Sequence, residues 1–79
     1  MTIEYGRPEP VYRQIAGFLR ARIESGEYPP GAVLPSEATL MQTYGVARET
    51  ARKATRVLVA EGLAAIHPGR GAYVSEAPE

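Results

Sequence analysis

The sequence contains no cysteine and only one histidine among its 79 residues. Without cysteine, the chain can form neither disulfide bonds nor thiolate metal sites. A zinc site would have to consist of carboxylates around His67, so we expect no metal and no other cofactor. No apolar run approaches the roughly 18 residues needed to span a bilayer, and the first ten residues lack the features of a signal peptide. These absences predict a cytoplasmic protein without a membrane partner.

The chain also has no net charge, because nine basic residues balance nine acidic ones. A neutral total by itself argues against a nucleic-acid partner. The charges are unevenly distributed, however, because residues 48–56 contain four basic residues and one acidic residue, a local net charge of +3. DNA binding requires a basic face rather than a basic total. Neutrality therefore does not exclude DNA as a partner.

Hydrophobic residues make up 44% of the sequence, which is enough for one small domain with a compact core. Residues 1–9 form a polar arm without periodicity. Pro10 suits the first turn of a helix, and the apolar residues that follow at helical spacing predict a helix that ends near Ser25-Gly26. After a turn rich in proline and glycine, residues 32–34 are enough to add one short strand to a small sheet, and Pro35 ends that strand.

Two further helices are predicted on either side of a tight turn at Gly45-Val46. Ser36 is a good N-cap for the first of them, and Glu37 suits the positive end of its dipole. The second should span residues 47–61. A short helix, a turn with glycine and a longer helix form the helix-turn-helix pattern, and in DNA-binding proteins its second helix lies in the major groove.

Basic residues recur along the helix predicted at residues 47–61. Arg48, Arg52 and Arg56 are four residues apart and form one ridge, with Lys53 beside it. A solvated helix face is the simpler explanation of such a ridge, so the ridge alone does not establish the function. The predicted core consists of Ile15, Leu19, Leu34, Leu40, Val46, Leu58 and Leu63.

The last third of the chain predicts a β-hairpin. Two short apolar segments, residues 63–67 and 72–74, flank a glycine-containing turn at residues 68–71. The order of elements predicts an α+β, mainly α fold: a winged helix-turn-helix with three helices and a small three-stranded antiparallel sheet. The turn would be the wing, with Arg70 between Gly69 and Gly71. Glycine lets a backbone approach DNA closely, and arginine fits phosphate and the narrow minor groove, so ridge and wing together favour binding to double-stranded DNA.

Six short motifs along the chain also match those of one known family. The motifs are Val11-Tyr12-Arg13-Gln14-Ile15, Gly26-Glu27-Tyr28-Pro29-Pro30-Gly31, Leu34-Pro35-Ser36-Glu37, Gly45-Val46-Ala47-Arg48, Glu61-Gly62-Leu63 and Pro68-Gly69-Arg70-Gly71. In this order and spacing, the chain from about Pro10 to Val74 resembles the N-terminal DNA-binding domain of the GntR family of bacterial transcription regulators, with most similarity to its HutC-type branch. The resemblance implies a sequence-specific regulator, most often a repressor, that binds an inverted-repeat operator as a homodimer.

The resemblance also implies a domain organisation. Residues 10–75 would form the DNA-binding domain, after an N-terminal arm at residues 1–9. Residues 76–79 would be a tail or the start of a linker to an absent effector-binding domain, because 79 residues leave no room for an effector pocket. We expect an excised domain, with a naturally short regulator as the alternative. Nothing in the sequence offers a long heptad seam or a large apolar surface, so the isolated domain should be a monomer.

Individual DNA contacts follow from the same resemblance. Arg48, Thr50 and Arg52 would lie on the DNA-contacting side of the recognition helix, and the wing tip would place Gly69 and Arg70 at the minor groove. We expect Arg48 and Arg52 to contact base edges. The residues expected to contact mainly phosphate are Ser36, Thr50, Lys53 and Arg56.

Three positions depart from the family pattern. Many relatives have arginine where this chain has Ala38, serine or threonine where it has Ala47, and a small or hydroxyl residue where it has Glu49. Glu49 could accept a hydrogen bond from a cytosine amine, or it could hold Arg52 or Lys53 by an ion pair. We favour the ion pair, because the neighbouring cations are certain to be present. These departures leave the class unchanged but put the usual operator consensus in doubt.

Two other functions compete with DNA binding as explanations of the sequence. Catalysis would need a base, a nucleophile or paired carboxylates on converging elements, and His67 stands alone while the acidic residues are scattered, so we expect no enzyme. A winged helix that binds another protein is the stronger alternative, since fold alone does not determine function. Such a helix would expose apolar residues where Arg48, Arg52 and Arg56 stand.

Overall fold

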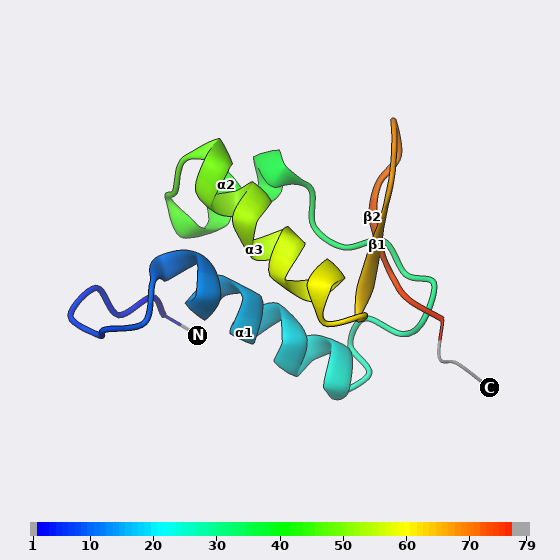
Figure 1. The fold of residues 1–79 in the computed structure, drawn as a ribbon, viewed down its shortest axis with the longest axis horizontal. Helices are drawn as coiled ribbons and strands as arrows, with labels where there is room; N and C mark the ends of the chain where they lie inside the picture. The colour runs from blue at the N-terminus through cyan, green and yellow to red at the C-terminus, as the bar shows by residue number, and fades with distance from the viewer. Residues whose placement is uncertain (1, 77–79) are drawn as a thin grey trace.

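The computed structural model describes residues 2–76 and contains three helices followed by a hairpin (Figure 1). Helices α1 and α3 lie side by side, α2 covers the start of α3, and the hairpin projects beside the end of α3. Among residues 2–76, no helix has the length and apolarity that a bilayer crossing requires. The elements are α1 (Val11–Glu24), α2 (Glu37–Tyr44), α3 (Arg48–Ala60), β1 (Ala64–His67) and β2 (Gly71–Val74).

The helix ends follow the local signals in the sequence. The Ser36 hydroxyl accepts a hydrogen bond from the Thr39 backbone N–H at 3.1 Å, which caps α2 as predicted. Gly45 ends α2 with a φ of 66°, a left-handed conformation that glycine adopts without strain. Ala47 precedes α3 without any side-chain cap. The three predicted helices are therefore confirmed, together with the tight turn that joins α2 to α3.

The prediction of a three-stranded sheet is wrong. Within residues 2–76, only β1 and β2 form a sheet, which is antiparallel, with Ala64 opposite Val74. The segment at residues 32–34 contributes one isolated bridge, between Val33 and Tyr73. Its neighbours on both sides include prolines, which lack a backbone N–H and restrict φ, so the ladder cannot extend. Two backbone bonds of 2.8 Å still tie this segment to β2.

The core lies between the three helices and the inner side of the hairpin. Ala51 and Ala54 are fully buried, and their small side chains let α3 pack closely on α1. Of the predicted core, Val46 and Leu63 are only partly buried. The remaining members of the predicted core are buried: Ile15, Leu19, Leu34, Leu40 and Leu58.

The N-terminal arm folds back on the start of α1. Gln14 is only 4% exposed, and its side chain makes three hydrogen bonds to the backbone of the arm. Its Oε1 atom accepts from the N–H of Glu4, while its Nε2 donates to the carbonyl oxygens of Glu4 and Glu9. Ile3 packs against the core from the same arm. Residues 2–9 form neither a helix nor a strand, but specific contacts hold them to the domain.

Candidate nucleic-acid interface

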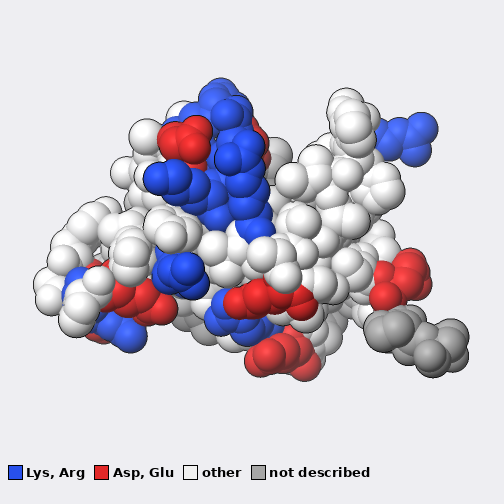
Figure 2. Space-filling model, viewed as in Figure 1, with Lys and Arg blue, Asp and Glu red and all other residues white. Residues whose placement is uncertain are grey.

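Basic side chains gather on the exposed side of α3 (Figure 2). Because the opposite side of this helix is buried, its charged residues face outward from the domain. A separate basic side chain lies at the tip of the hairpin, where Arg70 is exposed. Gly69 has a φ of 77°, which lets this tip turn sharply. The ridge and the wing therefore lie on separate elements of one surface.

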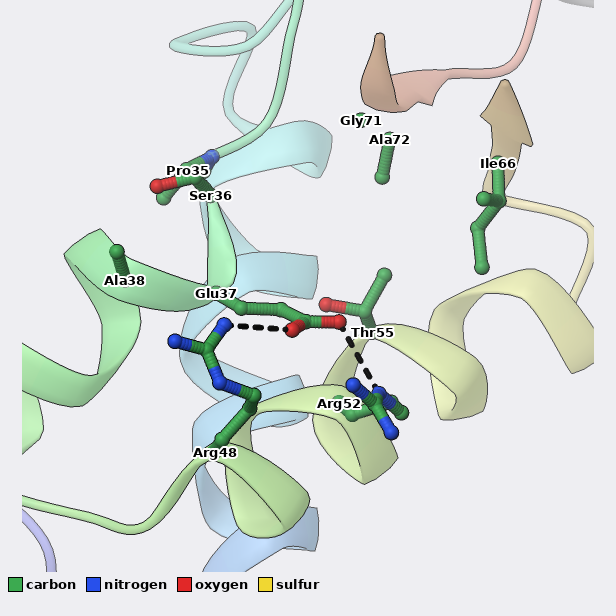
Figure 3. A pocket seen from close by; sticks show the side chains of 10 residues that line it. All are labelled: Pro35, Ser36, Glu37, Ala38, Arg48, Arg52, Thr55, Ile66, Gly71 and Ala72. Carbon is green, nitrogen blue, oxygen red and sulfur yellow. Dashed lines mark hydrogen bonds and ion pairs between the residues drawn. The ribbon is translucent and has the colours of Figure 1, made fainter. Parts of the chain in front are cut away.

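Glu37 joins the start of α2 to the two most N-terminal arginines of α3 (Figure 3). Its Oε1 accepts a hydrogen bond from Nη1 of Arg48 at 3.2 Å, and its Oε2 accepts one from Nε of Arg52, also at 3.2 Å. The hydrogen bond from Arg52, followed by that from Arg48, holds the pKa of Glu37 below its ordinary value. One ionised carboxylate therefore fixes two guanidinium groups side by side.

A second carboxylate approaches Arg52 from within α3. The Oε1 of Glu49 lies 3.6 Å from Nη1 of Arg52, so the predicted ion pair between them is present. Lys53, the other cation considered for Glu49, instead lies over the ring of Tyr12, with its Nζ 5.7 Å from the ring centroid. The hydrogen bond that Arg52 donates to Glu37 is the main reason that the pKa of Arg52 is raised. Arg52 is thus charged and held from two directions.

A cavity of about 320 Å³ opens between the start of α2, the side of α3 and the hairpin (Figure 3). Glu37, Arg48 and Arg52 line one part of it. Ile66 and Ala72 of the hairpin supply apolar lining, and Ile66 is 51% exposed. The cavity therefore combines paired charges with an apolar wall at the place where α3 meets the wing.

The predicted contact residues fall into separate groups in space. Ser36 lines the cavity with Arg48 and Arg52, although its hydroxyl already caps α2. Lys53 lies toward α1, on the flank of α3 away from Glu37. Arg56 is exposed on α3, Thr50 is half-buried there, and Gly69 and Arg70 belong to the wing tip. Ala38, the first departure from the family pattern, also lines the cavity.

Sequence reasoning missed the role of Glu37 in arranging this surface. The pattern around it indicated only a favourable helix dipole. Its two partners are 11 and 15 residues away, across a turn, so no helical periodicity connects them. Tyr12 was missed for the same reason, because it contacts Lys53 from another helix. An acidic residue just after the N-cap of a helix-turn-helix, opposite paired arginines, is the signal that could have found Glu37.

Comparison with known proteins places these features in a family. Residues 11–74 match the family described as "Bacterial regulatory proteins, gntR family". The mannosyl-D-glycerate transport/metabolism system repressor MngR of Escherichia coli (strain K12) is 44% identical over 68 residues, which are 86% of this chain and 28% of the relative. The HTH-type transcriptional repressor NagR of Bacillus subtilis (strain 168) is 41% identical over 76 residues, which are 96% and 31%. The chain therefore spans less than a third of the length of these two relatives.

A solved structure gives the same answer for the fold. The crystal structure of AraR(DBD) in complex with operator ORX1 superposes with a TM-score of 0.83 and 33% sequence identity. The match covers 95% of this chain and 99% of that chain. Because the family match runs from the start of α1 to the end of β2, the chain belongs to the gntR family of bacterial regulatory proteins.

Proposed function

We propose that this chain is a sequence-specific DNA-binding domain of a bacterial transcription regulator, acting as a repressor. The observation that carries the proposal is the pair of arginines held on the exposed side of α3 by Glu37, beside a wing with Arg70 at its tip. Family membership and the likeness to an operator-bound domain support it. The relatives named as repressors support the direction of regulation.

The proposed docking places α3 in the major groove. Arg48 and Arg52 then contact base edges, where arginine prefers the O6 and N7 atoms of guanine. Lys53 and Arg56 contact phosphate, with the hydroxyls of Ser36 and Thr50. Arg70 enters or borders the minor groove, whose narrow stretches attract arginine. Glu49 holds Arg52 in this arrangement through their ion pair, rather than contacting a cytosine.

Glu37 has two opposite effects on the binding of DNA: it orders the arginines in advance, and its negative charge opposes phosphate. Arginine loses side-chain freedom when it binds a base, and a side chain that is already ordered loses less. Ion pairs between exposed groups are weak, typically ~0–1 kcal/mol, so Arg48 and Arg52 can exchange Glu37 for DNA at little cost. The same carboxylate repels nearby phosphate groups. Glu37 thus lowers binding to DNA in general while it aims the arginines at bases.

The protein-binding alternative lacks a suitable apolar surface on α3. Within residues 2–76 the exposed large hydrophobic residues are Tyr5, Val33, Val59 and Ile66, and Val59 alone belongs to α3. Its exposed fraction is 36%. Contact surfaces between proteins are depleted of charge at their centre, whereas the exposed side of α3 carries its charge there. These features favour DNA as the partner.

We also propose that the isolated chain is a monomer and that two copies bind an inverted-repeat operator. Symmetric operators mirror two-fold symmetry in the bound protein. In a longer regulator, a further domain would bind an effector and hold the dimer. Sedimentation of the chain alone should give a monomer at micromolar concentration, and a tight dimer there would contradict the proposal.

Selection of bound duplexes from random oligonucleotides tests the function. We expect enrichment of one inverted-repeat sequence, and weaker binding to it by both Arg48→Ala and Arg70→Ala variants. If both variants bound the selected duplex as tightly as the parent, α3 and the wing would not be the DNA-contacting elements. If no sequence were enriched and no duplex were retained at low salt, the protein-binding alternative would replace the proposal.

A further inference from the structure

The basic residues differ in whether a carboxylate accompanies them. Five of the nine have one within 4.0 Å, including Arg48 and Arg52. Within residues 2–76, the other four make no such pair. Three of these four are already expected to contact DNA, but Arg13 is not, because it belongs to α1 rather than to the helix-turn-helix or the wing. The four are Arg13, Lys53, Arg56 and Arg70.

Arg13 and Lys53 share one aromatic ring. The guanidinium carbon of Arg13 lies 5.6 Å from the centroid of the Tyr12 ring, and the Nζ of Lys53 lies 5.7 Å from the same centroid. A cation within about 6 Å of an aromatic face is attracted by the ring. Tyr12 is itself half-buried and packs against the core, so the ring is fixed. One ring therefore gathers two exposed cations from α1 and α3, and no carboxylate within residues 2–76 lies within 4.0 Å of either.

Helix geometry explains which flank of α3 faces the Tyr12 ring. Successive residues are separated by about 100°, so Lys53 points well away from Arg52. Arg52 leans toward Glu37 of α2, whereas Lys53 leans toward Tyr12 of α1. The exposed side of α3 is therefore bordered by α2 on one flank and by the start of α1 on the other.

A helix in the major groove meets phosphate on both flanks. The groove is about 12 Å wide, and a helix with its side chains is about 10–12 Å across. The first helix of a helix-turn-helix crosses one DNA backbone, which assigns that backbone to the α2 flank. The opposite backbone then borders the flank where Tyr12, Arg13 and Lys53 meet.

We propose that Arg13 and Lys53, positioned by Tyr12, form a phosphate-binding site for the DNA strand on the α1 flank of α3. This inference rests on the proposed function, and it adds α1 to the DNA-contacting elements. The guanidinium and ammonium groups donate hydrogen bonds to non-bridging phosphate oxygens, which carry no sequence information. Tyr12 is a positioning residue here and acts through the two cations.

The test compares Arg13→Ala with Arg22→Ala on one random-sequence duplex over a range of salt concentrations. Both variants lose one positive charge from α1, but Arg22 pairs with Glu27 and bonds to the Tyr28 hydroxyl at the other end of the helix. Each phosphate contact contributes about 0.9 to the slope of log affinity against log salt. We expect Arg13→Ala to lower the slope by about that amount, so that its loss of affinity between about 50 and 200 mM salt is three- to fourfold smaller than that of the parent. Arg22→Ala should keep the parental slope.

The outcomes separate this inference from the proposed function. If the parent binds DNA with a steep salt dependence and Arg13→Ala retains the parental slope, α1 does not contact phosphate. If the parent binds no duplex at all, the proposed function itself is wrong. Tyr12→Phe keeps the ring and should bind as the parent does, whereas Tyr12→Leu keeps apolar bulk but should weaken binding to all duplexes alike. Equal binding by the parent and Tyr12→Leu would remove Tyr12 from the site.

Discussion

The Oε2 atom of Glu37 accepts a hydrogen bond from Nε of Arg52 at 3.2 Å, across the turn that separates α2 from α3. The other oxygen of the same carboxylate accepts from Arg48. Both arginines are at least 40% exposed, so water and salt weaken these contacts. Their effect is therefore on side-chain orientation more than on the stability of the fold. An acid among the cations of the proposed DNA-contacting surface should change how strongly and how selectively the chain binds DNA.

Glu37→Gln should lower discrimination between DNA sequences. Removing the negative charge raises affinity for a random duplex, while the two arginines lose their shared anchor. We expect the preference for the selected duplex over the random one to fall roughly fivefold, which is about 1 kcal/mol.

Competition titrations with the two duplexes measure this ratio of affinities directly. Glu49→Gln is the matched control, because it removes the same charge but only the longer 3.6 Å contact to Arg52. An undiminished preference in Glu37→Gln would show that the arginines need no anchor.

Arg48→Ala and Arg56→Ala should weaken DNA binding in different ways. Arg48 is expected to contact a base, so its loss should cost about 1–3 kcal/mol on the selected duplex and relax the preference at one base pair. Arg56 is expected to contact phosphate, so its loss should weaken all duplexes alike and lower the salt slope by about one. Binding measured on single-base variants of the selected site, at several salt concentrations, separates the two. Identical profiles for both variants would contradict the assigned roles.

Local sequence signals predicted the helices and the arrangement of the charges. Ser36, Gly45 and the buried alanines of α3 act on their own turn or on the adjacent helix, so their effect can be recognised from spacing alone. The prediction of a third strand at residues 32–34 failed because strand pairing depends on backbone N–H donors, which the flanking prolines lack. In this case the sequence showed the apolar residues but not how few ladder bonds they could make.

Contacts between separate elements could not be predicted in the same way. Glu37 meets its arginines across 11 and 15 residues, and Gln14 meets the arm across 10 and 5. Such pairs depend on the angle at which two elements cross, which no single periodicity determines. The ridge of α3 was therefore found from sequence, whereas the carboxylate and the aromatic ring that orient its cations required the structure.

The ion pair between Arg20 and Glu61 should make stability depend on pH. Arg20 donates from Nε at 2.9 Å and from Nη2 at 2.6 Å, which joins α1 to the end of α3. The hydrogen bond from Arg20 holds the pKa of Glu61 below its ordinary value of 4.5. A carboxylate with a lowered pKa in the folded state stabilises the fold above that ordinary value, and this contribution is lost as pH falls through the lowered pKa.

Glu61→Gln should therefore melt at a lower temperature than the parent near neutral pH. The difference should shrink as pH falls below 4.5, because the parent then loses the same interaction. Thermal melts followed by circular dichroism at several pH values measure this difference. Glu24→Gln is the control, since Glu24 acts on Arg20 only from a distance, without an ion pair within 4.0 Å in residues 2–76, so its removal should leave most of the acid dependence intact. A constant difference between parent and Glu61→Gln down to acid pH would assign the effect to packing rather than to charge.

Gln14→Ala should release the N-terminal arm from the domain. The Gln14 side chain is buried and accounts for the N–H and carbonyl of Glu4 and the carbonyl of Glu9, at 2.8–3.0 Å. Alanine removes all three bonds and leaves space beneath the arm, so we expect a loss of stability on the order of 1–3 kcal/mol. The more specific result is local, because the amide hydrogen of Glu4 should exchange with solvent much faster. The exchange rates of amides in the middle of α3 should change only as far as the global stability changes.

Gln42→Ala is the matched control, because Gln42 is exposed on α2 and makes no side-chain hydrogen bond within residues 2–76. Since the arm leads through Pro10 into the start of α1, its release also tests whether the first turn of α1, which contains Tyr12, is rigid on its own. Unchanged exchange at Glu4 in Gln14→Ala would mean that Ile3, packed against the core, holds the arm without the glutamine.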